Sequence, residues 1–204
     1  VGDYICFSYH ATKNVTSGGE GGSLLVRENM DNDKARIIFE KGTNRSAFLR
    51  GEVDRYRWVE LGSSFIGSYT AAALLENQLG FLDDITRERR KIWAQYHEAF
   101  LSFASADIIF SSPDNSPNGH IFWMTAEQSN IENFKNLASE FDVQLVSHYQ
   151  TLQGSLAGQK YSVRKTDVSV SEFASANLLR FPLWHAMQPK DVNPVLCLIE
   201  KALG

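Results

Sequence analysis

The sequence predicts an α/β protein that begins with two short strands joined by a glycine-rich connection carrying a lysine. Three observations predict this class. Segments rich in β-branched and aromatic residues alternate with amphipathic helical segments over about residues 105–204. Two more apolar segments, 4–8 and 23–27, flank the glycine-rich connection. Helical periodicity with one charged face separates the two regions.

Residues 1–60 contain the two predicted strands and little other regular structure. The strands span 4–8 (Tyr-Ile-Cys-Phe-Ser) and 23–27 (Ser-Leu-Leu-Val-Arg). The connection between them is about a dozen residues long, and such long loops are typically functional or disordered. Polar residues at 29–36 predict the start of a surface helix, and 37–60 are expected to be irregular.

Two helical segments follow. Apolar residues recur at three- and four-residue spacings from Ser68 to Leu82, and again from Ile85 to Phe100. Asp83 and Asp84 are expected to cap the second helix, where carboxylates favour the helix dipole. One face of that helix is charged and is expected to be solvated; it consists of Arg87, Glu88, Arg89, Arg90 and Lys91.

The remainder predicts shorter elements in a strand–helix–strand order, which is typical of an α/β region. Strands are expected at 107–110, 120–125, 143–146 and 178–183, helices at 130–141 and 190–203, and loops at 111–119 and 155–166.

Composition excludes several classes of function. The 204 residues are 43% apolar, enough for a core in one large domain or two small ones. The net charge of -4 has no basic block, so no nucleic-acid partner is expected. No apolar run or leader predicts a membrane span or export, so a cytoplasmic protein is expected. Cys6 and Cys197 are expected to be buried free thiols, and no cluster has metal-ligand spacing.

The start of the chain is unusual. No initiator Met is present, and the first residues already predict a strand. A strand needs a neighbour with which to pair, so we expect the sequence to be the later part of a longer protein. A processed chain with an unusual N-terminus is the alternative.

Lys13 lies in the glycine-rich connection and has neighbours that suit cofactor chemistry. A lysine becomes a nucleophile when burial or nearby positive charge lowers its pKa from about 10.4. Such lysines form Schiff bases with carbonyl compounds, including pyridoxal phosphate. Ser8 offers a hydroxyl at a strand end, His10 adds a polar contact, and the glycines let the backbone approach a ligand. A surface hairpin with an exposed lysine remains the alternative from composition alone.

Other candidate residues have weaker support. Asn44 and Arg45, in "GTNRS", would contact a phosphate or a carboxylate, or else form a turn with a solvated Arg. His148 and Tyr149 would line a substrate site, or else serve as structural residues.

Several motifs extend this interpretation. "FSYHATKN…GGEGG" has Ser8, His10 and Lys13 in the order of the lysine segment of the DegT/StrS-type sugar aminotransferases, and it resembles that family. The segments "EKGTNRSAFLRGEVDRYRW" and "LGSSF…AAALLENQL" resemble one branch more closely, the 4-aminotransferases of dTDP-4-keto-6-deoxyglucose. The resemblance continues through "HIFWM", "SHYQTL" and "LLRFPL", and so covers nearly the whole chain.

The resemblance implies a fold type I enzyme that uses pyridoxal 5′-phosphate. Residues 1–70 would be the end of the large cofactor-binding domain, 71–105 connecting helices, and 106–204 the small C-terminal α/β domain. Lys13 would hold the cofactor as a Schiff base and carry the proton, and Ser8 would bind the cofactor phosphate. His10 and Asn44 would assist at the cofactor; Arg45, His148 and Tyr149 would contact the substrate.

The same resemblance implies partners and a pathway class. The substrates would be a nucleotide-linked 4-keto-6-deoxy sugar and glutamate as amino donor, in surface-polysaccharide synthesis. Family members are dimers that share residues between active sites, so a homodimer is expected. The family's aspartate for the pyridine nitrogen and its stacking aromatic precede the lysine, so these 204 residues alone are expected to be catalytically incompetent.

The sequence departs from the family pattern at three positions. Ile66 stands where many relatives carry an Asn that reaches the neighbouring subunit's cofactor phosphate, and Tyr69 stands where an Asp often follows. Gln153 replaces a His in the later segment. Two alternatives follow: a dehydratase, which the presence of Lys13 disfavours because dehydratases of this family carry His there, and a non-catalytic homologue or fragment that keeps the fold.

Overall fold

The computed structural model describes residues 2–28, 32–103, 105, 107–114, 117–162 and 166–204. These residues form two compact units, Val1–Leu82 and Asp83–Gly204, which are described separately. The division falls at the start of the long helix Leu82–Phe103. The three-part division expected from the resemblance, with boundaries after residues 70 and 105, stays a prediction.

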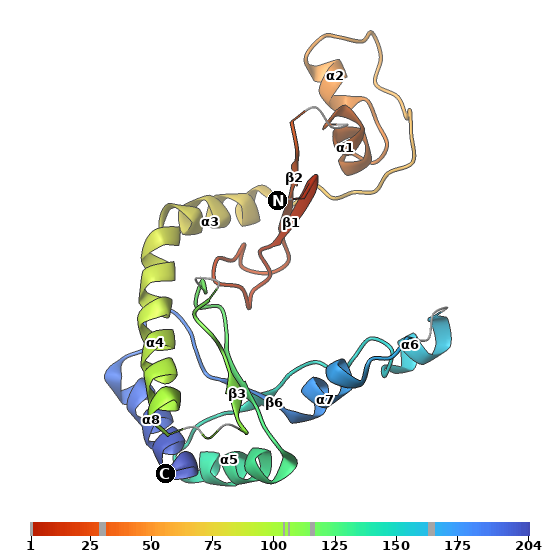
Figure 1. The fold of residues 1–204 in the computed structure, drawn as a ribbon. Coiled ribbons are helices and arrows are strands. Elements are labelled where there is room, and N and C mark those ends of the chain that lie inside the picture. The colour runs from red at the N-terminus through yellow and green to blue at the C-terminus, as the bar shows by residue number, and fades with distance from the viewer. Residues whose placement is uncertain (1, 29–31, 104, 106, 115–116, 163–165) are drawn as a thin grey trace. The chain divides into compact units, whose positions relative to one another are not determined.

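The first unit begins with an antiparallel hairpin. Strand β1 (Tyr4–Ser8) pairs with β2 (Gly22–Val26) so that Tyr4 lies opposite Val26 and Ser8 lies opposite Gly22 (Figure 1). Both predicted strands are confirmed, although β2 begins one residue earlier than expected. This register places the whole connection 9–21, including Lys13, at one end of the hairpin.

The described part of this unit also contains the helices α1 (Asn32–Phe39), α2 (Arg45–Leu49) and α3 (Tyr69–Gly80). Helix α1 agrees with the predicted surface helix, of which residues 29–31 lie outside the described part of the chain. Helix α3 begins where expected, because the Ser68 side chain accepts a hydrogen bond from the backbone N–H of Ala71 at 3.1 Å.

The segment from 37 to 60 was expected to be irregular, and that expectation is wrong in part. It contains the end of α1 and all of α2. Gly42 has φ 75°, and its carbonyl accepts hydrogen bonds from the N–H groups of Val59 (2.8 Å) and Glu60 (3.1 Å). A Cβ at Gly42 would collide with the Glu60 carbonyl. Glycine is therefore required where these two backbone segments meet.

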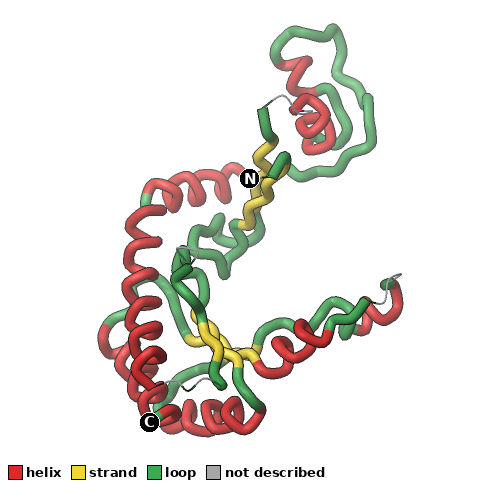
Figure 2. Tube along the Cα trace, viewed as in Figure 1, coloured by secondary structure: helices red, strands yellow, loops and turns green. Residues whose placement is uncertain are grey.

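The second unit consists of an antiparallel sheet and helices (Figures 1 and 2). The strand order is β3-β4-β6-β5, and every pairing is antiparallel. Its elements are α4 (Leu82–Phe103), β3 (Ile109–Phe110), β4 (Phe122–Thr125), α5 (Gln128–Glu140), β5 (Val146–Ser147), α6 (Leu156–Tyr161), α7 (Ser169–Asn177), β6 (Leu178–Phe181) and α8 (Pro189–Leu203).

Most predicted elements of this unit are present, with three corrections. The expected loop 155–166 contains α6, while residues 163–165 lie outside the described part. Helix α7 was not predicted. The strand expected at 143–146 is β5, which begins only at Val146.

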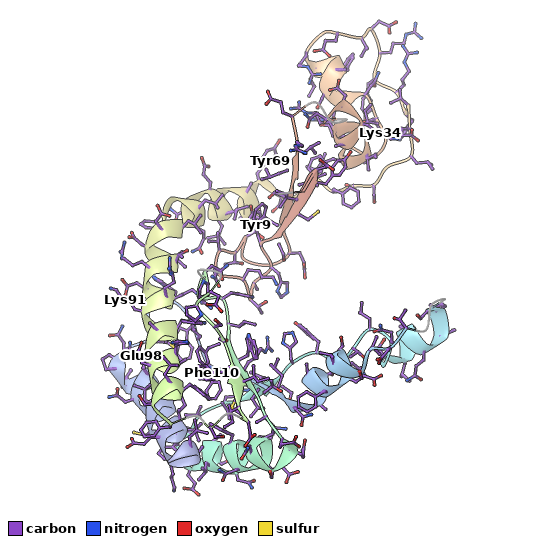
Figure 3. All side chains as sticks on the ribbon, viewed as in Figure 1. Tyr9, Lys34, Tyr69, Lys91, Glu98 and Phe110 are labelled. Atoms are coloured by element: carbon purple, nitrogen blue, oxygen red, sulfur yellow. The ribbon has the colours of Figure 1, made fainter. Side chains whose placement is uncertain are left out.

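One face of the sheet packs on the helices to form the core. The buried apolar residues alternate along β4 and β6, as a two-residue period requires. In Figure 3, Lys91 and Glu98 lie on the side of α4 away from β3, while Phe110 lies on β3. The central core residues are Tyr96, Phe100, Phe122, Met124, Ile131, Phe134, Leu179, Phe181, Val195, Leu198 and Ile199.

Helix α4 overturns two expectations. It begins at Leu82, so Asp83 and Asp84 lie in its first turn and are not its N-cap. Arg89, expected on a solvated face, is only 7% exposed. Its Nε donates to the carbonyl of Gly119 (2.7 Å), and one terminal nitrogen donates to the carbonyls of His120 (2.8 Å) and Leu183 (2.9 Å). Burial lowers the pKa of Arg89 from its usual value.

The cysteines are free, as predicted, but both Cys6 and Cys197 are exposed, so their expected burial is wrong. Cys6 is on β1, whose residues are mostly exposed, and Cys197 is on the outer side of α8.

Candidate functional site around the lysine hairpin

The connection that carries Lys13 is folded around one backbone carbonyl. The oxygen of Tyr9 accepts hydrogen bonds from the backbone N–H of Ser17 (2.9 Å) and from the Thr16 hydroxyl (3.3 Å), and the Ser17 hydroxyl lies 3.1 Å away. The N–H of Tyr9 donates to the carbonyl of Gly21 at 2.8 Å. These bonds return the chain to the start of β2. The connection is thus an ordered loop.

Two side chains anchor the loop from inside. Val15 and Ser17 are each 6% exposed, although they lie in a polar, glycine-rich stretch. The Ser17 hydroxyl is also 3.1 Å from the carbonyl of Glu20. Figure 3 shows Tyr9 at this end of the hairpin, and its hydroxyl lies 3.0 Å from the Ser23 hydroxyl.

Lys13 occupies the outer part of the loop and is exposed. Its backbone N–H donates to the carbonyl of His10 at 2.9 Å, which forms a tight turn. Among the described residues, no ion pair engages its amino group. Lys13 is therefore exposed, as the alternative of a surface hairpin expects. Its amine would be open to a ligand that approaches the loop.

Ser8 ends β1 and is exposed. Its hydroxyl is 3.5 Å from the backbone N–H of His10, which is a weak contact at the limit of hydrogen bonding. A hydroxyl and a backbone N–H that are both so loosely engaged are groups that a phosphate could bind together.

His10 is held in one orientation by the loop. Its Nδ1 accepts from the backbone N–H of Thr12 (3.3 Å) and lies 3.0 Å from the Thr12 hydroxyl. A neutral imidazole that accepts at Nδ1 carries its proton on Nε2. His10 Nε2 lies 3.5 Å from Oε1 of Glu20. Both ring nitrogens are thus engaged within the loop.

Asn44 and Arg45 lie near α2 and are occupied by their own unit. The Asn44 amide donates to the carbonyl of Arg55 (2.9 Å) and accepts from the N–H of Arg57 (2.8 Å). Arg45 lies 3.5 Å from Oε1 of Glu40, whose side chain is largely buried. The other oxygen of Glu40 accepts from the N–H (3.0 Å) and hydroxyl (2.9 Å) of Ser46. These contacts order the segment around α2.

His148 and Tyr149 follow β5 in the second unit. Their rings meet edge to face at 5.4 Å, and the Arg180 guanidinium carbon lies 5.9 Å from the Tyr149 ring centroid. Burial, together with the positive charge of Arg180, lowers the pKa of His148 from its usual value. Among the described residues, no carboxylate pairs with Arg180, and its Nε makes no hydrogen bond.

The structure brings only some of the predicted residues together. Ser8, His10 and Lys13 share one loop at the end of the hairpin. Asn44 and Arg45 belong to a separate cluster in the same unit, and His148 and Tyr149 belong to the other unit. Sequence reasoning missed Glu20 and Arg180. Glu20 lies ten residues after His10, and that spacing carries no sequence signal. Arg180 stands in an apolar strand, where an unpaired charge is unusual, and that was a signal.

The three departures from the family pattern are all accessible. Ile66 is 44% exposed, Tyr69 is 92% exposed, and Gln153 is half-buried. Ile66 lies just before α3, and Tyr69 is its first residue.

A hollow of about 710 Å³ lies between the hairpin and α1, but Lys13 does not line it. Its walls are mainly apolar and include Tyr4, Phe7, Leu24 and Phe39. In the part of the chain that the structure describes, no group of His, Cys, Asp or Glu has the geometry of a metal site. No described helix has the length and apolar character needed to cross a membrane.

Solved structures with this fold define the class. An aminotransferase from Brucella abortus superposes with a TM-score of 0.82 at 21% identity, covering 100% of this chain and 52% of its own. The putative sugar aminotransferase Spr1654 from Streptococcus pneumoniae in its PLP form superposes with a TM-score of 0.76 at 21% identity, covering 100% of this chain and 53% of its own. The chain thus has the α/β fold of the sugar aminotransferases, which confirms the fold class in this general form.

Residues 1–200 match the model of the DegT/DnrJ/EryC1/StrS aminotransferase family, and the chain belongs to that family. The resemblance found in the sequence is confirmed. The spore coat polysaccharide biosynthesis protein SpsC of Bacillus subtilis is 25% identical over 205 residues, which cover 96% of this chain and 52% of that protein. The chain spans about half the length of the curated relatives it matches. Pyridoxal 5′-phosphate, the expected cofactor, is the cofactor of this family, and Spr1654 is known in PLP and PMP forms.

Proposed function

We propose that this chain carries the cofactor lysine of an aminotransferase that acts on a nucleotide-linked keto sugar. The observation that carries the proposal is the ordered loop that presents Lys13 beside Ser8 at the end of the hairpin, in a chain of this family. The finer assignment is amino transfer from glutamate to dTDP-4-keto-6-deoxyglucose by a homodimer, and it rests on the sequence resemblance of segments 40–58 and 61–79.

The residues present fit the aldehyde and the phosphate of pyridoxal phosphate. The exposed primary amine of Lys13 suits covalent capture of an aldehyde, and the exposed Ser8 hydroxyl with the His10 N–H suits a phosphate. When bound, the cofactor supplies an electron sink for breaking the C–H bond next to nitrogen. In the proposed roles, Lys13 holds the cofactor and moves the proton, while Ser8 binds its phosphate.

His10 has a proposed supporting role. Because Thr12 and Glu20 occupy its two ring nitrogens, His10 would hold the loop in shape beside the cofactor. Asn44 would act at a distance by ordering residues 55–57, and Arg45, His148 and Tyr149 are proposed as substrate contacts. A chain that keeps the fold without catalysis is the second candidate, and the exposure of Lys13 favours it.

Borohydride trapping with pyridoxal phosphate separates the two candidates. The expected result is a phosphopyridoxyl group on Lys13 by peptide mass spectrometry, lost in Lys13→Arg and kept in Lys34→Arg, which changes another exposed lysine of the same unit. In the full-length protein, Lys13→Arg should abolish amino transfer to the keto sugar. Labelling spread over several lysines, with full activity of Lys13→Arg, would contradict the proposal.

A further inference from the structure

The sheet of the second unit has a face that does not belong to the core, and Arg180 lies on it. Phe122, Met124, Leu179 and Phe181 are buried on the core face. Residues alternate between faces along a strand, so Arg180 projects on the opposite side. Its cross-strand neighbours there are Trp123 on β4 and Val146 on β5.

This face holds polar atoms that are buried from solvent and have no hydrogen-bond partner among the described residues. The Nε of Arg180 is buried and makes no hydrogen bond in the described structure, and the same is true of the Thr125 hydroxyl oxygen. Thr125 lies two residues from Trp123 on β4, so it shares the face with Arg180. Buried polar groups are normally satisfied, and an orphaned one in a native fold requires an explanation.

The groups around Arg180 leave its hydrogen-bond donors available. The Tyr149 ring lies 5.9 Å from the guanidinium carbon, and stacking on an aromatic ring uses the face of a guanidinium while its N–H groups lie in its plane. Tyr149 is 78% exposed, so the cluster is open to solvent. His148 adjoins Tyr149, and its pKa is lowered by burial and, in addition, by the positive charge of Arg180.

We propose that Arg180, together with Tyr149 and His148, forms a binding site for an oxyanion of a substrate, either a phosphate or a carboxylate. The planar guanidinium fork matches two oxygens of either group, and such charge-assisted pairs are strong. The site would satisfy the orphaned Nε and neutralise the unpaired charge. The choice of ligands to test rests on the proposed function, whose two substrates carry a nucleotide diphosphate and an amino-acid carboxylate.

Calorimetric titration with inorganic phosphate, dTDP and glutamate tests the site in the full-length protein. Arg180→Gln should weaken binding of dTDP or of glutamate about tenfold or more, the loss expected for a charge-assisted bidentate contact. The ligand that is affected identifies the source of the oxyanion. The matched control is Arg90→Gln, an equal charge change at an exposed residue of α4, which should leave both affinities unchanged.

The pKa of His148, followed by NMR, provides a test in the unmodified protein. An anion bound at Arg180 would offset its field, so dTDP or glutamate should raise the pKa of His148. Unchanged affinities in Arg180→Gln with no shift of His148 would overturn the inference. A loss of thermal stability in Arg180→Gln without any loss of binding would also overturn it, because Arg180 would then have only a structural role. Amino transfer with normal substrate affinities in Arg180→Gln would refute this site alone, whereas anion binding without amino transfer would refute only the proposed function.

Discussion

The backbone N–H of Ser17 donates to the carbonyl of Tyr9 at 2.9 Å, and this bond closes the loop that carries Lys13. The Ser17 side chain adds a second contact to the same oxygen at 3.1 Å and is buried. The seven residues between them, which are mostly small or polar, are thereby held in one conformation without an extensive apolar core. The position of Lys13 is determined by backbone carbonyls that lie on either side of it in the sequence.

Replacing Ser17 tests how the loop is held. Ser17→Ala removes a buried hydroxyl that contacts the carbonyls of Tyr9 and Glu20, so it should lower the free energy of unfolding by about 1–2 kcal/mol. Amide hydrogen exchange across residues 9–21 should accelerate. Thr70→Ala, at an exposed position of α3 in the same unit, is the control and should change stability by less than about 0.5 kcal/mol. Equal effects of the two substitutions would count against the role of Ser17.

Two glycines allow the energetic cost of backbone strain to be measured separately from the cost of a steric collision. Gly42 (φ 75°) and Gly51 (φ 74°) both lie in the left-handed region, but only Gly42 has a neighbour that a Cβ would strike. Gly51→Ala should cost about 1–2 kcal/mol from conformation alone. Gly42→Ala should cost clearly more, because the Glu60 carbonyl must also move. Denaturant unfolding of the pair measures the difference, and similar midpoints would show that the 40–62 segment can shift freely.

The buried Arg89 should be difficult to replace. Its three hydrogen bonds to the carbonyls of Gly119, His120 and Leu183 fix two loops to α4. Arg89→Met leaves these carbonyls without a donor, so we expect a loss of roughly 3 kcal/mol or more in unfolding free energy. Arg89→Lys should recover only part, since an ammonium cannot span all three acceptors. Arg90→Met, its exposed neighbour, should be nearly neutral in the same urea titration.

Acid should destabilise the second unit partly through His148. Its pKa is lowered in the folded protein by burial and by Arg180, so folding disfavours the protonated ring. The contribution of neutral His148 to the free energy of unfolding is complete above the ordinary histidine pKa of about 6.5. It is lost as the pH falls from there through the lower pKa of the folded state. His148→Gln should make the unfolding free energy fall less between about pH 7.5 and pH 5. An unchanged pH profile in that variant would show that folding does not lower the pKa of His148.

Some elements could be predicted because their sequences carry a local signal. The alternation of β-branched and aromatic residues at 4–8 and the three-and-four spacing in α3, α4 and α8 are local patterns, and in α4 and α8 they correspond to a buried face. Helix α6 was missed because Gly158 lies inside it, although Ser155 caps it by accepting from the Gly158 N–H at 2.9 Å. Arg89 was misplaced because its neighbours are charged, although it lies four residues from both Ile85 and Trp93, on their buried side.

The candidate site likewise has a part that the sequence could predict and a part that it could not. Ser8, His10 and Lys13 could be selected from the spacing of "SYHATK" and its resemblance to a known lysine segment. The hydrogen bonds that give their loop its shape could not, because they join Tyr9 to Ser17 and Gly21 only after the hairpin has formed. Arg180 could be judged only from its surroundings, since whether a charged residue in a strand has a partner depends on which strands lie beside it.

The sequence by itself determined the family, the hairpin strands, the long helices and the lysine, because periodicity and short motifs are properties of neighbouring residues. Only the tertiary structure decided that Arg89 is buried, that both cysteines are exposed, and that Arg180 lacks a carboxylate among the described residues. Burial and charge pairing depend on contacts between residues far apart in the chain, and these contacts exist only once the sheet and helices have packed together.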